Sequence, residues 1–360
     1  MTALAPKRGV VFETATMNDY SITLDTSDSK SFAFTSTPQE SLLEAALRQD
    51  ILLPANCRSG SCGACVARVE SGLVQLTEIS GSVLDAAQRA QGQVLLCRAY
   101  AESDVHLSAP YPSDKVRLQQ VIARNTTIDR MELLAQDTLG LWLQLEPHAS
   151  LGAGAEFEPG QYMELRVPGT DQWRPFSLAS IPNWDGALQF VITLRPDGLL
   201  SNYLRHHAQV GQSLEVRGPF GDFTLQETGR ARWFIAGGSG LAPELSMLRR
   251  MADWGDDTPT RLYFGVRHET SLFLLDELAA LEQRLPGLAM HLCVSRPGPQ
   301  SAHAARNIVD TFRDDLSRAA RKPDVYVCGS DRLLAGVRGA AQECGLPAQQ
   351  LFSESFGSLD

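Results

Sequence analysis

The chain has 360 residues, a length that exceeds one ordinary hydrophobic core and predicts two or three domains of about 100 to 150 residues each. Its composition, 43% hydrophobic and 21% charged, is that of an ordinary globular protein, and its formal net charge of -10 argues against a nucleic-acid partner, because binding phosphates needs a basic surface. No stretch approaches about 18 uncharged apolar residues, and the basic pair Lys7-Arg8 is not followed by the apolar segment of about 7 to 15 residues that a signal peptide has. We therefore expect a cytoplasmic protein that does not bind nucleic acid or insert into a membrane.

The first predicted domain spans residues 18–112 and follows an N-terminal extension, residues 1–17. Alternating apolar residues predict strands, and apolar residues at helical spacing predict one helix, in the order of a small mixed β-grasp domain. The predicted elements are two hairpin strands, a helix and two later strands, at Tyr20–Leu24, Phe32–Phe34, Gln39–Arg48, Ala64–Val69 and Val94–Cys97.

Four cysteines of this domain, Cys57, Cys62, Cys65 and Cys97, have the spacing of a plant-type [2Fe-2S] cluster. The residues between positions 59 and 64 are otherwise small, which lets backbone N–H groups turn toward the sulfur atoms. A structural zinc site and a pair of disulfides are the alternatives. A zinc site usually pairs two CxxC-like knuckles, and a single Cx4CxxC before one late cysteine fits neither alternative well.

A turn-rich segment at residues 109–114 predicts a linker, and residues 113–227 form the second predicted domain. Short apolar runs punctuated by glycine and proline, without long helices, predict an antiparallel β-barrel. The runs are Val116–Ala123, Met131–Leu134, Leu139–Leu145, Tyr162–Val167 and Leu188–Leu194.

One strand of this barrel carries residues suited to a nucleotide cofactor. Arg174, Phe176 and Ser177, in the run RPFSLAS, offer a cation for a pyrophosphate, a ring for a planar group and a hydroxyl for a ring nitrogen. The alternative is an ordinary solvated arginine on a barrel strand.

Two further segments are weaker candidates. Residues 195–204 resemble a phosphate-facing turn that opens a short helix, where free N–H groups attract an anion. Gly218 and Pro219, in GPFG, predict a tight turn that closes the barrel, and a plain β-turn without ligand contact is an equal alternative.

The third predicted domain, residues 228–360, alternates apolar strands with helical stretches, the pattern of a parallel α/β sheet. Its predicted strands are Trp233–Ala236, Arg261–Val266, Met290–Val294 and Val325–Cys328.

A glycine-rich junction follows the first of these strands, in AGGSGLAP. Glycines there allow a cofactor diphosphate to approach the start of the next helix, although Pro243 stands where the usual dinucleotide fingerprint has its third glycine. Cys328 and Gly329 end a later strand at the edge of the sheet where ligands bind, the alternative being a buried inert thiol. Phe356 is interpreted as an edge-strand anchor or as a lid over a flavin ring.

Taken in order, the cysteine loop, RPFSLAS, GPFG, AGGSGLAP, VCGS and FSESF resemble the reductase components of bacterial ring-hydroxylating (Rieske) oxygenases, of the benzoate dioxygenase reductase type. The resemblance extends from about residue 18 to the end of the chain. It implies a plant-type ferredoxin domain fused to a ferredoxin-NADP reductase-like flavoprotein, with a [2Fe-2S] cluster, FAD and NADH as cofactors.

The resemblance also implies roles for barrel residues. Arg174 would hold the FAD pyrophosphate, Phe176 would pack on the isoalloxazine ring, where the family more often has Tyr, and Ser177 would hydrogen-bond near the flavin N5. The implied FAD and phosphate contacts in this domain are Arg174, Pro175, Phe176, Ser177, Arg195, Gly198, Ser201, Gly218 and Pro219.

In the third domain, the implied contacts to the NAD(P) diphosphate are Gly237, Gly238, Ser239, Gly240 and Pro243. Cys328 and Gly329 would lie near the nicotinamide, Phe356 would cover the ring face that the nicotinamide displaces, and Glu354 would be a hydrogen-bonding neighbour. The implied catalytic residues are Ser177, Cys328, Glu354 and Phe356.

A nicotinamide delivers two electrons as a hydride, whereas the cluster accepts one, so a flavin between them must split the pair. The resemblance therefore predicts an NADH-dependent enzyme, a monomer, that passes electrons through FAD and the cluster to a terminal Rieske-type aromatic-ring oxygenase in a transient complex. The alternatives are the reductase of a diiron hydroxylase and a non-catalytic iron-sulfur redox sensor. Arg267 and Arg296 lie where a 2′-phosphate would bind, but the family mostly prefers NADH.

Overall fold

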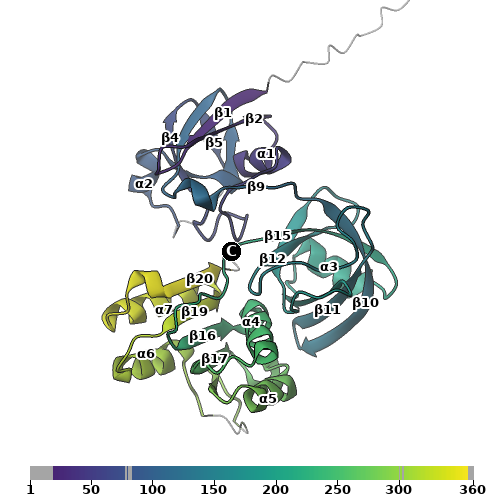
Figure 1. Cartoon of the computed structure of the whole chain (residues 1–360), viewed down its shortest axis with the longest axis vertical. Coiled ribbons are helices and arrows are strands. Elements are labelled where there is room, and N and C mark those ends of the chain that lie inside the picture. Colours follow the sequence, from purple (N-terminus) through teal and green to yellow (C-terminus); the bar gives the residue numbers. More distant parts are fainter. Residues whose placement is uncertain (1–18, 78, 80–82, 300, 302–303, 356–360) are drawn as a thin grey trace, which may run out of the picture.

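A computed structural model describes residues 19–355 apart from 78, 80–82, 300 and 302–303. The described chain folds into three lobes that follow one another in sequence, each built around its own main sheet (Figure 1). The predicted extension at residues 1–17 and Phe356 lie outside the described residues. None of the helices in the described part of the chain is long and apolar enough to cross a membrane.

The first lobe is a five-stranded mixed sheet with one helix packed on it. Its elements are β1 (Tyr20–Asp25), β2 (Ser31–Ser36), α1 (Leu42–Arg48), β3 (Ile51–Leu52), β4 (Val66–Ser71), β5 (Val74–Leu76), α2 (Ala86–Ala90), β6 (Gln93–Leu95), β7 (Ala99–Ala101) and β8 (Val105–Ser108). The strand order is β2-β1-β8-β4-β6, and β1 pairs antiparallel with β2 and parallel with β8. Helix α1 begins where Ser41 Oγ accepts a hydrogen bond from Glu44 N, and it buries Leu42 and Leu43 against the sheet. This arrangement confirms the predicted β-grasp fold.

Two predicted strands of this region are corrected. The strand expected at Val94–Cys97 ends at Leu95, and Cys97 lies in a 3₁₀ turn, η1 (Leu96–Arg98). The barrel strand expected at Val116–Ala123 is wrong, because a two-residue strand, β9 (Arg117–Leu118), pairs with β3 of the first lobe. Val116, one of the apolar residues that suggested a barrel strand, is instead buried in the core of the first lobe and holds the linker against it.

The second lobe confirms the predicted antiparallel barrel. Its elements are β10 (Ala123–Ala135), β11 (Thr138–Leu145), β12 (Tyr162–Arg166), β13 (Trp173–Ser177), β14 (Ala187–Thr193), α3 (Leu199–His206) and β15 (Ser213–Phe220). The strand order is β13-β12-β15-β10-β11-β14, and a bridge between Leu178 and Phe190 joins the two outer edges of this order. Gly218 and Pro219 lie in β15 rather than in a tight turn, because that strand pairs with β12 as far as Phe220.

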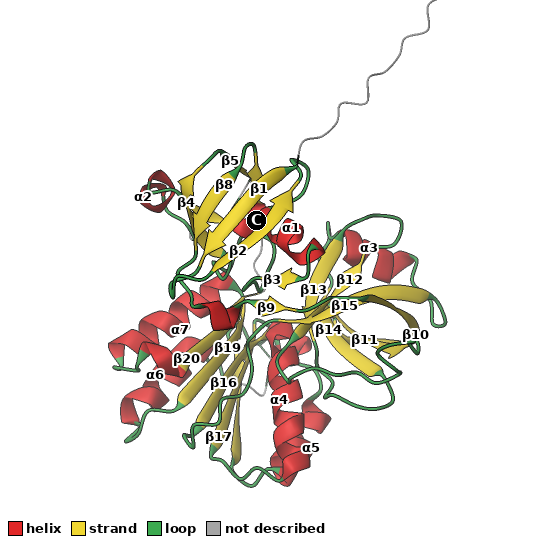
Figure 2. Cartoon of the chain, turned by 45° about the horizontal axis from the view of Figure 1, so that its top comes forward, coloured by secondary structure: helices red, strands yellow, loops and turns green. Residues whose placement is uncertain are grey.

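The third lobe is a parallel α/β domain, as predicted. Its elements are β16 (Arg232–Gly237), α4 (Leu241–Trp254), β17 (Thr260–Val266), α5 (Leu275–Arg284), β18 (Leu288–Val294), α6 (Ile308–Arg318), β19 (Asp324–Gly329), α7 (Asp331–Glu343) and β20 (Leu351–Ser355). The strands run parallel in the order β18-β17-β16-β19-β20. Helices α4 and α5 cover one face and α6 and α7 the other (Figure 2). Strand order reverses direction at β16, which makes the carboxyl ends of β16 and β19 the expected ligand-binding crevice.

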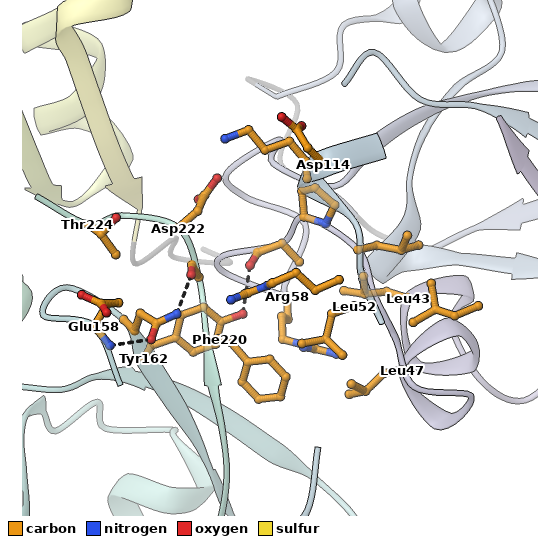
Figure 3. Close-up of a pocket in the computed structure, with 18 residues that line it drawn as sticks. Leu43, Leu47, Leu52, Arg58, Asp114, Glu158, Tyr162, Phe220, Asp222 and Thr224 are labelled. Atoms are coloured by element: carbon orange, nitrogen blue, oxygen red, sulfur yellow. Dashed lines mark hydrogen bonds between the residues drawn. The ribbon is translucent and has the colours of Figure 1, made fainter. Parts of the chain in front are cut away.

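Side chains join the lobes. The first and second lobes enclose a cavity of about 260 Å³, lined by Leu52 and Arg58 on one side and by Tyr162 and Phe220 on the other (Figure 3). The second and third lobes are joined by Arg249 of α4, whose Nη1 donates to the carbonyl oxygen of Ala179 at 2.6 Å. The lobes therefore meet through specific polar contacts as well as apolar surface.

Candidate functional site

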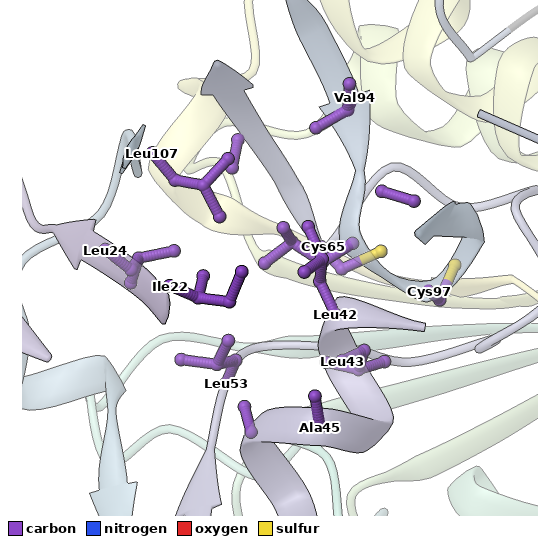
Figure 4. Packing of buried hydrophobic residues seen from close by; sticks show 14 of the residues in the cluster. Ile22, Leu24, Leu42, Leu43, Ala45, Leu53, Cys65, Val94, Cys97 and Leu107 are labelled. Atoms are coloured by element: carbon purple, nitrogen blue, oxygen red, sulfur yellow. The ribbon is translucent and has the colours of Figure 1, made fainter. Parts of the chain in front are cut away.

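The four predicted cluster cysteines converge at one end of the first lobe. Cys65 and Cys97 lie side by side at the edge of its apolar core, next to Leu42 and Leu43 (Figure 4). The side chain of Cys57 interacts with that of Cys62, and the side chain of Cys65 with that of Cys97. Among the described residues, no three His, Cys, Asp or Glu side chains are grouped closely enough to hold a single metal ion. The thiols thus form two pairs, a division that suits a cluster of two irons, each held by two cysteines.

Backbone N–H groups of the loop point at the sulfur atoms. Ser59 N and Ser61 N lie 3.4 and 3.3 Å from Cys57 Sγ, and Ala64 N lies 3.5 Å from Cys62 Sγ. The hydrogen bond between the two thiols lowers the pKa of Cys57 and raises that of Cys62, and hydrogen bonds from Ser61 and Ser59 lower the pKa of Cys57 further. Such donors stabilise thiolates, the form in which cysteine binds iron, so the loop fits the cluster that its spacing predicts.

The backbone of the loop requires glycine at position 60. Gly60 has a φ of +84°, and a Cβ added there would lie 2.9 Å from Cγ of Arg98. Arg98 in turn donates from Nε to the carbonyl oxygen of Ser59 at 3.1 Å. The small residues noted in the sequence therefore let the loop close around its own N–H donors.

Three of the predicted catalytic residues lie together where the second and third lobes meet. Ser177, at the end of β13, donates from Oγ to Glu354 Oε2 of β20 at 2.8 Å. Cys328 Sγ, at the end of β19, lies 3.9 Å from the same oxygen. All three side chains are buried.

The surroundings of Glu354 keep its carboxyl group neutral near pH 7. Burial is the main cause that raises the pKa of Glu354 to about 8, and the hydrogen bond from Ser177 opposes this shift only in part. Burial likewise raises the pKa of Cys328 well above its ordinary value. The pocket therefore presents neutral hydrogen-bonding groups, which suits the passage of a hydride.

Arg174, the predicted diphosphate contact on β13, lies near Arg98 of the first lobe. Arg174 is half-buried and donates to the carbonyl oxygen of Trp173 and to Gln172 Oε1. Burial and then the nearby cation Arg98 lower the pKa of Arg174. Two neighbouring cations, one of them partly removed from water, favour a bound anion such as a diphosphate. Phe176, two residues along β13, is half-buried at the edge of the barrel core, and Pro175 lies between them.

The other predicted barrel contacts are placed as follows. Gly198 is the N-cap of α3 and has no side chain to cap it, so the first N–H groups of that helix remain available to an anion. Arg195 is exposed, and its backbone N donates to Ser201 Oγ at 3.0 Å. At the end of β15, a Cβ added to Gly218 would lie 3.1 Å from Cγ of Met163.

The glycine-rich junction divides into an accessible part and a buried part. Gly237, Gly238 and Ser239 are partly exposed at the end of β16 and in the turn η3 (Gly238–Gly240). Gly240 and Pro243 are buried, and a Cβ added to Gly240 would lie 2.2 Å from the carbonyl oxygen of Cys328. Gly240 therefore permits close packing of the junction on β19. Of the five predicted diphosphate contacts, the first three are the ones open to a ligand.

Sequence reasoning missed a buried ion network between the first and second lobes. It consists of Glu44, Arg58, Glu164 and Arg217, whose charged atoms lie 2.6 to 3.1 Å apart. Glu164 is 2% exposed. A lone carboxylate inside the apolar run at 162–167 was the available signal, because charged glutamates are rarely buried without a paired cation.

Three family models match the chain, one in each lobe. The 2Fe-2S iron-sulfur cluster binding domain matches residues 25–102, the oxidoreductase FAD-binding domain residues 125–225, and the oxidoreductase NAD-binding domain residues 234–339. The chain therefore holds a [2Fe-2S] cluster, FAD and a nicotinamide nucleotide as cofactors.

Relatives align over most of the length of the chain. The toluate 1,2-dioxygenase electron transfer component of Pseudomonas putida is 36% identical over 89% of this chain and 93% of its own length. The propane 2-monooxygenase reductase component of Rhodococcus jostii is 34% identical over 89% of this chain and 87% of its own. The crystal structure of a cytochrome P450 reductase from Amycolatopsis matches with a TM-score of 0.77 and 27% identity, over 94% of this chain and 100% of that one. These relatives, the three family models and the geometry of the sites agree, and the chain belongs to the family of electron-transfer reductases of multicomponent oxygenases, NAD(P)H-dependent flavoproteins that carry a [2Fe-2S] domain.

Proposed function

We propose that this reductase takes electrons from NADH and delivers them, through FAD and then the [2Fe-2S] cluster, to a terminal Rieske-type oxygenase that acts on an aromatic acid. One observation supports the proposed order of the cofactors. Tyr162 links the cluster loop to the pocket of Ser177 and Glu354: its hydroxyl donates to the carbonyl oxygen of Ala55, two residues before Cys57, and a Cβ added to Gly221 would lie within 4 Å of both the Tyr162 ring and Glu354 Oε1. Groups from all three domains thus meet at one point.

In this proposal, residues of β13 hold the flavin. Arg174 binds the diphosphate of FAD, with Arg98 adding positive potential, and Phe176 packs on the isoalloxazine ring. Ser177 lies at the edge of the ring, where its single hydroxyl proton would be donated to the flavin in place of its present bond to Glu354. When bound, FAD supplies the exchange between a two-electron donor and a one-electron acceptor.

The third domain would orient the nicotinamide. Gly237, Gly238 and Ser239 hold the diphosphate at the start of α4, where the N-terminal N–H groups lack a side-chain cap. Cys328 and Glu354 border the hydride path, and the neutral carboxyl of Glu354 keeps negative charge away from it. For Phe356 we keep the proposed role of a cover over the ring.

We propose NADH rather than NADPH as the donor. Arg267 and Arg296 stand at the carboxyl ends of β17 and β18, where a 2′-phosphate would bind, but both are exposed, as loop cations usually are. Steady-state rates with each nucleotide at matched concentrations test this assignment. Equal or faster turnover with NADPH would overturn it.

The proposed identity of the partner oxygenase is inferred from the relatives of this chain. Three relatives are electron transfer components of toluate, anthranilate and 2-halobenzoate 1,2-dioxygenases, at 31 to 36% identity. Reductase components of propane 2-monooxygenase, at 32 to 34%, support the second candidate, a diiron hydroxylase as partner. Product formation in reconstituted mixtures, with a benzoate-type Rieske dioxygenase in one and a diiron hydroxylase in the other, distinguishes the two. Coupled turnover only with the hydroxylase would overturn the Rieske assignment.

The order of the cofactors has its own test. Cys62→Ala removes one cluster ligand, so we expect NADH-driven reduction of the oxygenase to be lost while NADH-driven reduction of ferricyanide, which takes electrons from the flavin, is retained. Cys344→Ala, which changes a free cysteine far from the loop, is the matched control for both assays. Oxygenase reduction that survives in the Cys62 variant would place the cluster off the electron path.

A further inference from the structure

Side chains of strand β12 contact the cluster loop on both sides of the ligand Cys57. Tyr162 donates from its hydroxyl to the carbonyl oxygen of Ala55 at 3.0 Å, two residues before that ligand. Glu164 Oε1 lies 3.0 Å from Nε of Arg58, the residue directly after it. Tyr162 and Glu164 are two positions apart and so lie on the same face of the strand.

Arg58 is held more firmly than an ordinary surface arginine. Its side chain is 8% exposed, its Nη2 lies 2.9 Å from Glu44 Oε1, and its guanidinium carbon lies 5.0 Å from the centre of the Phe220 ring. Figure 3 shows this side chain extending from the loop toward Phe220 and Tyr162. Its backbone has a φ of +49°, a left-handed conformation that residues other than glycine keep only where surrounding contacts impose it.

The contacts of Arg58 belong to a closed ring of four charges. Arg217 Nε lies 2.6 Å from Glu164 Oε2, and its Nη2 lies 3.0 and 3.1 Å from the two oxygens of Glu44. Two members come from the ferredoxin domain and two from the flavin domain, and positive and negative charges alternate. The ring has no net charge, and each of its ions is paired with one from the other domain.

The same strand reaches the flavin site. β12 pairs along its length with β13, so that Tyr162 stands opposite Ser177 and Glu164 opposite Pro175. A Cβ added to Gly221 would lie 3.0 Å from the Tyr162 ring and 3.9 Å from Glu354 Oε1, which places Tyr162 beside the predicted catalytic pocket. The cluster loop and the proposed flavin strand are therefore fixed to one rigid element.

We propose that Arg58 and Glu164 are a positioning pair that holds the Cys57 side of the cluster against β12, and that the rate of electron transfer from flavin to cluster depends on this ion pair. The inference rests on the proposed order of cofactors. The step itself moves one electron: the reduced flavin loses it, the oxidised cluster gains it, and no bond is made or broken. Arg58 also belongs to the turn in which Ser59 N and Ser61 N face Cys57 Sγ. Loss of its ion pair would therefore disturb the surroundings of a cluster ligand as well as the distance between flavin and cluster.

The test uses the full holoprotein in Arg58→Met, Arg58→Lys, Glu164→Gln and the Arg58→Met/Glu164→Gln double variant. Rapid mixing with NADH follows the flavin and cluster bands separately. We expect flavin reduction at the rate of the unsubstituted chain, and cluster reduction several-fold slower in both single charge-removing variants, because loosening the loop changes the distance that the electron crosses between flavin and cluster. The double variant should be no slower than Arg58→Met, and Arg58→Lys should recover part of the rate.

A second readout does not depend on turnover. Hydrogen exchange at the amides of residues 59 and 61 should accelerate in Arg58→Met and Glu164→Gln. Arg48→Met, which removes an ion pair between Glu40 and the exposed side chain of Arg48 on the same domain, is the matched control and should leave both readouts unchanged. The spectrum of the dithionite-reduced cluster reports whether each variant has assembled it.

Normal cluster reduction in Glu164→Gln would overturn the proposal, and so would slowing of equal size in Arg48→Met. If Arg58→Met fails to assemble the cluster, Glu164→Gln decides, because it leaves the ferredoxin domain unaltered. An unsubstituted chain whose cluster NADH cannot reduce would instead refute the proposed order of cofactors.

Discussion

Ser177 Oγ donates a 2.8 Å hydrogen bond to Glu354 Oε2 although 177 positions separate the two residues. The bond joins the end of β13, in the FAD-binding domain, to β20, the last strand of the NAD-binding domain. Both side chains are buried, so the contact depends on how the two domains pack. It places a neutral carboxyl group at the proposed site of hydride transfer, and the pH dependence of that step follows.

The rate of NADH-driven ferricyanide reduction should fall as the pH rises through about 8. Burial raises the pKa of Glu354 to about 8, so its carboxyl is neutral below that pH and negatively charged above it. A negative charge beside the hydride path opposes transfer. One unit above the pKa only about a tenth of the carboxyls remain neutral, which sets the expected size of the loss.

Glu354→Gln keeps a neutral group of similar shape at that position. Its pH–rate profile should therefore be flat between pH 7 and about pH 9, where the unsubstituted chain declines. The two profiles are compared at saturating NADH and constant ionic strength. An identical decline in the glutamine variant would assign the titration to another group.

Arg174→Gln should weaken the binding of FAD by about tenfold to a hundredfold, since hydrogen bonds to charged groups contribute about 1.5 to 3 kcal/mol. Equilibrium dialysis of the apoprotein with FAD measures the change. Arg130→Gln, at an exposed position of the same barrel, is the control and should bind FAD normally. Equal affinity of the two variants would remove Arg174 from the proposed diphosphate site.

Gly240→Ala should destabilise the NAD-binding domain by about 1 to 3 kcal/mol, because its Cβ would lie 2.2 Å from the carbonyl oxygen of Cys328 and force two backbone segments apart. Gly339→Ala, in α7, has no heavy atom within 4 Å of its new Cβ and should stabilise by about 0.5 to 1 kcal/mol. Urea denaturation of both variants checks the opposite signs. A stable Gly240 variant would mean that β19 can yield at this point.

Arg230→Met should lower the free energy of unfolding by about 1 to 3 kcal/mol, since it leaves the fully buried carboxylate of Asp324 with one partner fewer. Arg230 Nε lies 2.7 Å from Asp324 Oδ1, and Thr228 donates to the other oxygen. Arg284→Met breaks a pair with Asp253 in which both side chains are exposed, so the expected loss is about 0 to 1 kcal/mol. Similar losses in the two variants would contradict the role assigned to burial.

Local patterns in the sequence were enough for the three folds and for the presence of a [2Fe-2S] domain, while the individual cluster ligands stay predictions. The spacing of Cys57, Cys62 and Cys65 lies within nine residues, so the geometry of one loop follows from it directly. The change from barrel strands to alternating strands and helices after residue 232 likewise reflects periodicities that each element carries within itself. The boundaries of the three domains and the roles of individual FAD and NAD residues stay predictions.

Only the tertiary structure decided what depends on contacts between distant residues. The apolar run at 116–123 predicted a barrel strand, yet the short strand within it pairs with the first domain. The sequence of a strand does not determine which other strand it pairs with. Gly240 was predicted from the sequence to contact a ligand, but in the structure it is buried against β19. The neutral carboxyl of Glu354 and the pairing of Arg58 with Glu164 arise from burial between domains, and burial is set by the packing of surfaces that are far apart along the chain.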